Sequence, residues 1–370
     1  MKICFLGRVA EALQGNTPGG AEMQISLLAK ALVRDGCQVD VIDPPIAQSF
    51  RTGEGIDVWN IPQWSHGIRG LRLITHRLPG LVKALYEHPA DVYYVRGRSF
   101  WFFVVAAVAK RLRGKFIVAV AHDSDLMQFR DRYRLFYRYD KGLWEWLSNY
   151  LLTEVFSPIV LRFADILFVQ HEKQKQLAEQ RGKRAILFRN ILDNSLSVAE
   201  PRSMKRNYVV VGELSVRKGL PILLQIVTEC PDEIFEIIGP PTDNEGVKAF
   251  DILKSLRNTV MWGRLDNAKT RELIAHSKAL VNTSLVEGFP NTFLEAWCIG
   301  KPVISFNVDP DGVIAKYNLG VACSGDLQLM KKYITGNNFS YDPTVLKKYV
   351  AKFHSVAAAA SKFRSYVTVD

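Results

Sequence analysis

The chain has 370 residues, of which 48% are hydrophobic and 23% are charged. This composition is typical of a globular protein with a sizeable core, and the length suggests about two domains. The longest uninterrupted apolar run, residues 100–109, is about half as long as a membrane-spanning helix requires, so we expect no transmembrane helix.

The formal net charge of +11 is concentrated in the first half of the chain. Residues 1–195 contain 27 Lys+Arg against 19 Asp+Glu, which gives +8, and the remainder contains 21 against 18, which gives +3. A basic surface attracts nucleic acid, an anionic membrane or a phosphorylated substrate. The sequence contains no nucleic-acid-binding module, so we expect no nucleic-acid partner. The five cysteines are odd in number and include no C-x-x-C pair, which argues against disulfides or a zinc site and predicts a cytoplasmic protein.

Short β-branched or aromatic runs alternate with amphipathic, helix-length segments from the first residues onward. In the first half we predict strands at residues 2–7, 38–42, 91–95, 115–121, 165–170 and 185–190. Between the first two, residues 21–34 carry apolar side chains at helical spacing, and Gly36 supplies a C-terminal signal. The strand, helix, strand order predicts a parallel sheet covered on both faces.

A polar stretch at residues 193–207 interrupts this pattern, which then restarts. The second series of predicted strands covers residues 207–212, 234–239, 260–263, 278–284 and 301–306. We therefore predict two doubly wound α/β domains, residues 1–195 and 196–350, with a final helix at 351–370 that crosses back to the first domain. Because such sheets bind ligands at the carboxyl ends of their strands, we expect the site in a cleft between the domains.

Neither common phosphate-binding motif is present, since the chain lacks both G-x-G-x-x-G after the first strand and G-x-x-x-x-G-K-[ST]. Instead, Gly-containing turns open helices at residues 18–22 (PGGAE) and 287–292 (EGFPNT). A helix N-terminus offers backbone N–H groups and partial positive charge, so each turn could hold phosphate oxygens. Such turns also begin helices that bind nothing, and for PGGAE this alternative stays open.

Two carboxylates accompany the second turn. Glu287 follows a predicted strand and should face the cleft, and Glu295 should lie in the first turn or so of the next helix. Carboxylates repel phosphate and accept hydrogen bonds from hydroxyls, so sugar hydroxyls are the better partners. The alternatives are that Glu295 only complements the helix dipole and that Glu287 is an exposed loop carboxylate.

The run EGFPNTFLEAWCIGKPVI, residues 287–304, resembles the E-x7-E signature of the family-four retaining glycosyltransferases of GT-B fold. Further segments similar to this family follow its order over nearly the whole chain: PGGAE (18–22), AHDSD (121–125), VVVGELSVRKG (209–219), VMWGRL (260–265) and PDGVIAKYNLG (310–320). The resemblance implies two Rossmann-like domains facing each other across a cleft. It also implies a nucleotide-diphosphate sugar on the C-terminal domain, an acceptor on the basic N-terminal domain, and no required metal or other cofactor.

The resemblance implies three catalytic residues, Glu287, Lys218 and His122. Glu287 would bind hydroxyls of the transferred sugar, Lys218 would neutralise the leaving diphosphate, and His122 would face the sugar. The residues implied to bind the donor are Gly19, Gly20, Arg217, Arg264, Gly288, Phe289, Pro290, Asn291, Thr292 and Glu295. In this set Glu295 would bind the ribose, backbone groups of residues 288–292 the phosphates, and Arg264 the base. A loop lysine, a structural histidine and a solvated arginine are the alternatives for Lys218, His122 and Arg264.

One departure from the family pattern concerns the diphosphate. The family usually has Gly-Arg after the strand at 207–212, whereas this chain has Gly212 and Glu213. Either Arg217 substitutes for the missing arginine, or the affinity for the donor is poor.

The acceptor is harder to predict. Residues 64–83 and 130–150 are aromatic and basic, which would suit peripheral contact with an anionic membrane and a glycan or lipid-linked acceptor. A solvated basic face is the alternative. Two competing functions also stay open: a sugar-nucleotide epimerase, against which the E-x7-E run argues, and a non-catalytic relative, which Glu213 favours.

Overall fold

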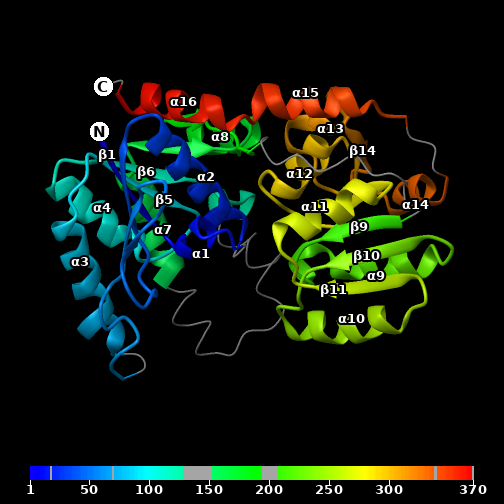
Figure 1. Ribbon diagram of the computed structural model, residues 1–370, viewed down its shortest axis with the longest axis horizontal. Helices are drawn as coiled ribbons and strands as arrows, with labels where there is room; N and C mark the ends of the chain where they lie inside the picture. Colours follow the sequence, from blue (N-terminus) through cyan, green and yellow to red (C-terminus); the bar gives the residue numbers. More distant parts are fainter. Residues whose placement is uncertain (17–18, 69–70, 128–151, 194–206, 337–339, 369–370) are drawn as a thin grey trace. The chain divides into compact units, whose positions relative to one another are not determined.

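The computed structural model describes residues 1–16, 19–68, 71–127, 152–193, 207–336 and 340–368 (Figure 1). Its internal contacts divide the chain into two compact units. Unit 1 holds the described residues of Met1–Leu126, Gly142–Ile191 and Val356–Asp370, and unit 2 holds those of Met127–Lys141 and Leu192–Ser355. Within the described ranges, no helix is both long enough and apolar enough to cross a bilayer.

Among its described residues, unit 1 forms one eight-stranded sheet in the order β3-β4-β2-β1-β5-β6-β7-β8. Its strands are β1 (Lys2–Leu6), β2 (Gln38–Ile42), β3 (Phe50–Arg51), β4 (Asp57–Trp59), β5 (Val92–Arg96), β6 (Lys115–Ala119), β7 (Ile166–Val169) and β8 (Ala185–Leu187). The predicted strand at 38–42 is confirmed at both ends. The predicted strands pair in parallel, and one additional edge strand, β3, pairs antiparallel with β4. These two strands are too short to give a periodic signal in the sequence.

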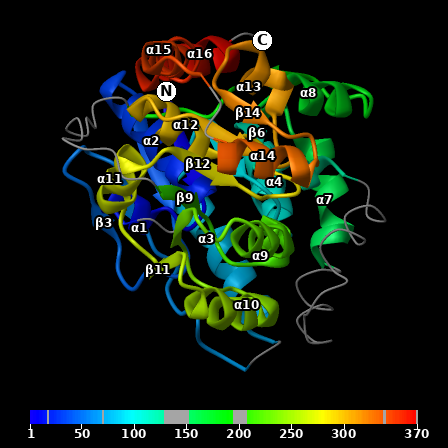
Figure 2. The ribbon, with the colours of Figure 1, turned by 90° about the vertical axis from the view of Figure 1, so that its right-hand side faces the viewer.

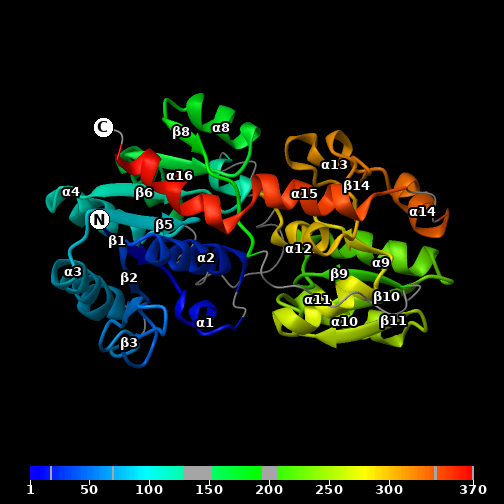
Figure 3. The same ribbon diagram turned by 45° about the horizontal axis from the view of Figure 1, so that its top comes forward.

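Helices cover the sheet of unit 1 on both faces. They are α1 (Ala10–Leu13), α2 (Gly20–Arg34), the π-helical turn η1 (Leu73–Arg77), α3 (Leu78–Glu87), α4 (Phe102–Arg111), the short 3-10 helix η2 (Asp123–Leu126), α7 (Leu152–Phe163), α8 (Glu172–Glu179) and α16 (Val356–Thr368). Helix α16 packs beside α2, although more than 300 residues separate them in the chain (Figure 3). Its Phe363 is fully buried, with its ring centroid 5.7 Å from that of Phe168.

Unit 2 contains a six-stranded sheet among its described residues, in the order β11-β10-β9-β12-β13-β14. All of its strand pairs are parallel. The strands are β9 (Asn207–Val211), β10 (Ile234–Ile238), β11 (Thr259–Gly263), β12 (Ala279–Asn282), β13 (Val303–Ser305) and β14 (Gly320–Ala322). The five predicted strands are all present, and β14 is an additional edge strand.

The helices of unit 2 alternate with these strands. They are η5 (Val216–Lys218), α9 (Leu220–Glu229), α10 (Asn244–Ser255), α11 (Asn267–His276), α12 (Asn291–Ile299), η6 (Pro310–Gly312), α13 (Val313–Lys316), α14 (Leu327–Gly336) and α15 (Pro343–Phe353). Helices α9 and α10 lie side by side on one face of the sheet (Figure 2).

Each unit has hydrophobic clusters on both faces of its sheet. In β1, Ile3 and Phe5 enter one cluster, whereas Cys4 and Leu6 enter another, because successive strand residues point to opposite faces. Burial on both faces explains why these strands are continuously apolar. The observed architecture is therefore two doubly wound α/β units, as predicted.

The strand order creates a switch point in each sheet. In unit 1 the chain runs outward from β1 to β2 and then returns to the other side of β1 with β5. In unit 2, β9 has β10 on one side and β12 on the other. Doubly wound sheets bind ligands at the carboxyl ends of the strands beside such a point. This rule directs attention to the residues that follow β1 and β5, and to those that follow β9 and β12.

Candidate active site

Two predicted catalytic residues meet at the switch point of unit 2. Lys218 ends η5, after β9, and Glu287 lies in the loop after β12. The Lys218 ammonium forms an ion pair with Oε1 of Glu287, and the hydroxyl of Ser284 donates to the same carboxylate oxygen at 2.9 Å. The Glu287 side chain is only 10% exposed. Glu287 is thus a held, largely buried carboxylate and not an exposed loop residue.

Gly219 allows the two loops to come this close. Its φ of +72° lies in the left-handed region, and a Cβ at this position would lie 1.8 Å from the carbonyl oxygen of Thr283. The Thr283 hydroxyl in turn donates to the carbonyl of Lys218 at 2.9 Å. A glycine directly after the lysine is therefore a steric requirement for placing Lys218 beside Glu287.

The turn before α12 offers backbone to a ligand. Pro290 is the N-cap of this helix and has no side-chain cap hydrogen bond. Gly288 is buried, whereas Asn291 and Thr292 are half-buried. Phe289 is 5% exposed and packs its ring against His354, with centroids 4.9 Å apart. The side chain of Phe289 therefore belongs to the core, which leaves its backbone as the part that a donor could contact.

Glu295 lies near the N-terminus of α12. The helix begins at Asn291, four residues before Glu295, which agrees with the expected position in the first turn or so. Burial raises the pKa of this carboxyl, and Arg271 only partly offsets the effect. A carboxylate that complements a helix N-terminus would have a lowered pKa. The raised pKa therefore argues against a role in simple dipole compensation.

The two arginines assigned to the donor are placed differently. Arg217 donates to Glu213 at 3.3 Å, so the carboxylate that replaces the usual family arginine is neutralised by its neighbour four residues on. Both side chains are more than one-third exposed, so this pair contributes little to stability. Arg264, which follows β11, is exposed.

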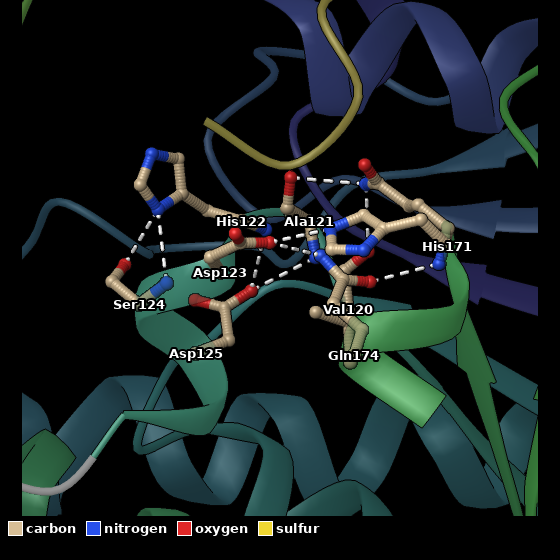
Figure 4. Close-up of polar contacts among 9 residues, drawn as sticks. Val120, Ala121, His122, Asp123, Ser124, Asp125, His171 and Gln174 are labelled. Carbon is tan, nitrogen blue, oxygen red and sulfur yellow. Dashed lines mark hydrogen bonds and ion pairs between the residues drawn. The ribbon is translucent and has the colours of Figure 1, made fainter. Parts of the chain in front are cut away.

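His122 and the two N-terminal glycines belong to unit 1. His122 follows β6, and its Nδ1 accepts the backbone N–H of Ser124 at 3.1 Å (Figure 4). Because Nδ1 is an acceptor here, the proton of a neutral ring lies on Nε2. The same Nδ1 lies 2.8 Å from the Ser124 hydroxyl, and the imidazole points away from His171 and Gln174 (Figure 4).

A network that sequence reasoning missed supports the loop that carries His122. Asp123 accepts hydrogen bonds from Nε2 of His171 and Nε2 of Gln174, both at 2.8 Å (Figure 4). Asp125 accepts the backbone N–H groups of Ala121 and His122 at 2.8 and 3.0 Å. Burial raises the pKa of Asp125, and these two hydrogen bonds oppose that shift. The loop is thus fixed from both sides.

The sequence contained only part of the signal for this network. The AHDSD segment (121–125) resembles the family and includes His122, but the sequence predicts no role for Asp123 or Asp125. His171 and Gln174 lie at the junction of β7 and α8, where polar residues directly after a buried strand mark the same carboxyl edge of the sheet. That positional rule could have identified them.

Gly19 and Gly20 begin α2 in unit 1. Gly19 is the N-cap, and a Cβ there would lie 2.6 Å from Oε2 of Glu22. The Glu22 carboxylate thus folds back over the N-terminus of its own helix, the arrangement that complements the partial positive charge there. In this structure a carboxylate occupies the place where the sequence suggested phosphate oxygens.

Comparisons with known proteins agree with this architecture. Residues 205–334 match the family model described as glycosyl transferases group 1, and residues 18–186 match the one described as glycosyltransferase family 4. A comparison with curated protein sequences gave no match.

Solved structures of similar fold span the whole chain. A sucrose-phosphate synthase from Thermosynechococcus elongatus has a TM-score of 0.75 at 14% identity, covering 99% of this chain and 98% of its own. Anabaena HepE in complex with UDP and glucose has a TM-score of 0.69 at 16% identity, with both chains fully covered. WaaG, a glycosyltransferase involved in lipopolysaccharide biosynthesis, has a TM-score of 0.68 at 14% identity, also with full coverage of both.

At these identities the structural likeness establishes the fold. The two family matches lie one after the other and together cover most of the chain. The chain therefore belongs to the family-four retaining glycosyltransferases, nucleotide-sugar enzymes of GT-B fold.

Proposed function

We propose that this enzyme transfers a sugar from a nucleotide-diphosphate sugar, bound by unit 2, to a hydroxyl of a cell-surface glycan or polysaccharide precursor, bound by unit 1. The observation that carries the donor assignment is the ion pair of Lys218 and Glu287 next to the N-terminus of α12. Cation, hydroxyl acceptor and backbone N–H donors are the three kinds of group that a diphosphate sugar needs.

Each residue has a defined part in the proposed reaction. Lys218 turns from Glu287 to the diphosphate, and Glu287 accepts hydrogen bonds from the sugar hydroxyls. Glu295 accepts a hydrogen bond from the ribose, and His122 donates from Nε2 to the sugar. The bond between the anomeric carbon and the diphosphate oxygen breaks, the acceptor oxygen bonds to that carbon on the same face, and the acceptor proton passes to the leaving phosphate.

In this scheme, the main catalytic effect is stabilisation of the charge on the leaving diphosphate. Negative charge develops on the leaving diphosphate, where Lys218 and the N-terminus of α12 stabilise it. No second carboxylate is needed across the scissile bond, in contrast to glycosidases. Lys218 and Arg217 are the two cations near this turn, each paired with a carboxylate, and we assign the diphosphate to Lys218 because it lies beside Glu287.

The test is thermal stabilisation of the purified protein by UDP, GDP, ADP and CMP. HepE was solved with UDP, so UDP is the first nucleotide to examine. We expect one nucleotide to raise the melting temperature, Lys218→Ala to abolish the shift, and Lys269→Ala to retain it. Lys269 is a matched control because it forms an exposed ion pair with Glu272 on α11 of the same unit. No shift with any nucleotide at millimolar concentration would contradict the proposed donor site.

A transfer assay follows with sugars of the nucleotide that binds. Product formation that requires an acceptor, with the anomeric configuration of the donor retained, supports the proposed reaction. Conversion of the nucleotide sugar without any acceptor would favour an epimerase. Binding without turnover of any sugar would favour a non-catalytic relative.

We further propose that unit 1 contacts an anionic membrane through exposed apolar side chains just before and at the start of η1. Ile68, Leu71 and Ile74 are 71%, 56% and 67% exposed, which is unusual for large apolar side chains so close together. Of the basic residues expected here, Lys83 is exposed, Arg72 and Arg77 are half-buried, and Arg69 lies outside the described residues. The second expected segment, residues 130–150, also lies outside them.

Flotation with vesicles containing phosphatidylglycerol tests this contact. We expect binding at low salt that Ile74→Glu weakens and Ile252→Glu does not. Ile252 is the control because it is 51% exposed on α10, in unit 2. Equal effects of the two substitutions, or no flotation of the unmodified protein, would contradict membrane contact through this segment.

A further inference from the structure

A cavity of about 580 Å³ lies at the switch point of unit 1. Its walls come from the residues after β1 and β5, the start of α2, the turn after β2, and η1 with the loop before it. This volume is in the range of cavities that bind small molecules, and the carboxyl ends of β1 and β5 are where a doubly wound sheet places its ligand. The roles assigned above to His122, Gly19 and Gly20 do not use it.

The basic side chains that line this cavity are all arginines: Arg8, Arg77, Arg96 and Arg98. Arg98 is neutralised, since it pairs with Glu154 at 2.8 Å and donates to Ser157 at 2.8 Å. The other three form no ion pair with any carboxylate among the described residues. A guanidinium presents its donors in a planar fork that matches the oxygens of a phosphate or a carboxylate.

Arg96 has hydrogen-bonding capacity left. One of its terminal nitrogens donates to Oδ1 of Asn190 at 2.6 Å. Its Nε is buried and has no hydrogen-bond partner within the part of the chain that the structure describes. A buried donor without a partner costs free energy, and an oxyanion in the cavity could satisfy it.

Arg77 is held against two aromatic rings. Its guanidinium carbon lies 5.1 Å from the ring centroid of Trp64 and 6.0 Å from that of Trp101, and its Nε donates to the Trp64 carbonyl at 3.0 Å. The ring centroids of the two indoles are 4.9 Å apart. The cavity thus combines a fixed cation with aromatic surface, and an indole beside polar groups suits a ligand with both polar edges and apolar faces, as a sugar ring has.

One carboxylate shares the cavity wall. Glu22 lines it, but its Oε2 is directed to the N-terminus of α2, next to Gly19. Counting four arginines against Glu22 and the Glu154 that pairs with Arg98 leaves a formal charge of 4 − 2 = +2 at the cavity. A bound anion would offset this positive charge directly.

We propose that this cavity binds an acceptor that is an anionic saccharide, whose phosphate or carboxylate meets Arg77 and Arg96 and whose ring faces Trp64 and Trp101. The proposal rests on the proposed function in calling the ligand an acceptor, but the cavity's preference for an anionic sugar is independent of the donor site. It names a substrate class that the family assignment leaves open.

Isothermal titration tests it with three probes: glucose 6-phosphate, glucuronate and glucose. We expect both anionic sugars to bind at least about tenfold more tightly than glucose, since a charge-assisted hydrogen bond contributes about that factor. Arg77→Gln should weaken the anionic sugars by about tenfold or more and leave glucose unchanged. The matched control is Arg111→Gln, which removes the same charge from an exposed residue at the end of α4.

A second variant keeps the test valid if Arg77→Gln unfolds. Arg8 is exposed on the loop after β1 and lines the same cavity, so Arg8→Gln should fold and weaken the anionic sugars in the same direction. Equal affinity for all three sugars, equal binding by the cavity variants and Arg111→Gln, or no binding of any probe at about 10 mM would overturn the proposal.

Two further experiments are needed. The first asks whether the anionic group belongs to a lipid or to a sugar, and the second separates the cavity proposal from the proposed donor site. Vesicles containing phosphatidylinositol carry the same chemistry in a lipid headgroup. Flotation of the unmodified protein that is lost in Arg77→Gln would identify the lipid headgroup as the source. Binding of glucose 6-phosphate that is lost in Arg77→Gln, with no flotation of the unmodified protein, would identify a soluble or glycan-borne group. Nucleotide-induced stabilisation should be unchanged in Arg77→Gln. If no nucleotide binds but anionic sugars still do, the proposed function fails and the cavity assignment stands.

Discussion

Lys218 and Glu287 neutralise each other in this structure, although each is proposed to contact a different part of the donor. Binding of a diphosphate sugar would exchange this ion pair for two charge-assisted contacts, one from Lys218 to the diphosphate and one from the sugar hydroxyls to Glu287. The pair therefore holds both side chains close to their working positions. Such preorganisation lowers the cost of ordering them when the ligand arrives.

Glu295 should make donor binding dependent on pH. Its pKa is raised by burial, so it becomes protonated at a higher pH than an ordinary glutamate and loses its strength as an acceptor for the ribose. We expect nucleotide affinity to fall from about pH 8 to about pH 5 in the unmodified protein. In Glu295→Gln the affinity should be lower at about pH 8 and should fall less toward about pH 5, with the remaining fall due to protonation of the nucleotide's terminal phosphate.

The same residue should have the opposite effect on stability. A carboxyl whose pKa is raised by folding contributes stability below its unfolded-state pKa, and loses it as the pH rises through the folded value. Glu295→Gln should therefore melt higher than the unmodified protein at about pH 8, with the difference vanishing toward about pH 4. Melting curves without nucleotide measure this, and a variant that melts lower at every pH would contradict the assignment of a buried, costly charge.

Gln174 is expected to act through the loop that carries His122. It is fully buried, and its amide donates to Asp123, so Gln174→Glu would set two carboxylates against each other. We expect the melting temperature to fall by the equivalent of about 1–3 kcal/mol and kcat to fall, while nucleotide affinity stays unchanged. Gln176→Glu, on the exposed face of α8, is the control. An unchanged kcat in a folded Gln174→Glu protein would separate this network from the reaction.

At the scale of elements, the contact between the η5 loop and the loop after β12 shapes the donor site. Gly219→Ala would place a methyl group 1.8 Å from the Thr283 carbonyl at a φ of +72°, so the two loops must separate. We expect loss of nucleotide binding and a strongly lowered melting temperature for unit 2. Gly263→Ala has a similar φ of +65° but meets nothing within 4 Å, so it should cost only about 1–2 kcal/mol. Similar losses in the two variants would refute the steric explanation.

At the scale of the whole molecule, each unit has its own hydrophobic clusters, and these clusters share no residues. The proposed donor residues Lys218, Glu287 and Glu295 all belong to unit 2. In differential scanning calorimetry we expect a nucleotide to raise the transition of unit 2 and to leave that of unit 1 nearly unchanged.

A substitution of Phe363 tests the same independence of the two units from the side of unit 1. It is fully buried in unit 1 on α16, so Phe363→Ala should lower only the unit 1 transition, by about 3–5 kcal/mol. Lys362→Ala, its exposed neighbour, should leave both transitions in place. A single transition that moves with both perturbations would show that the two units unfold as one.

The sequence could predict the features that depend on local pattern. Alternation of apolar runs with helical periodicity was enough for the doubly wound class and for most strand positions, because burial on both faces leaves a continuous signature in each strand. The two-residue strand β3 was missed, since a hairpin of that length has no periodicity. The predicted place of Glu295, four residues past Asn291, agrees with the observed start of α12 at that residue.

The chain by itself also predicts a donor site, because Lys218, Glu287 and Glu295 stand next to glycine-containing turns in a pattern that resembles the family. Tertiary structure alone decided the rest. The Asp123 and His171 network joins residues 48 positions apart, Arg96 and Asn190 meet across 94 positions, and Arg77 reaches Trp101 from another segment. Such pairs leave no local trace, because side chains from different strands meet only when the sheet forms and brings its carboxyl ends to one edge.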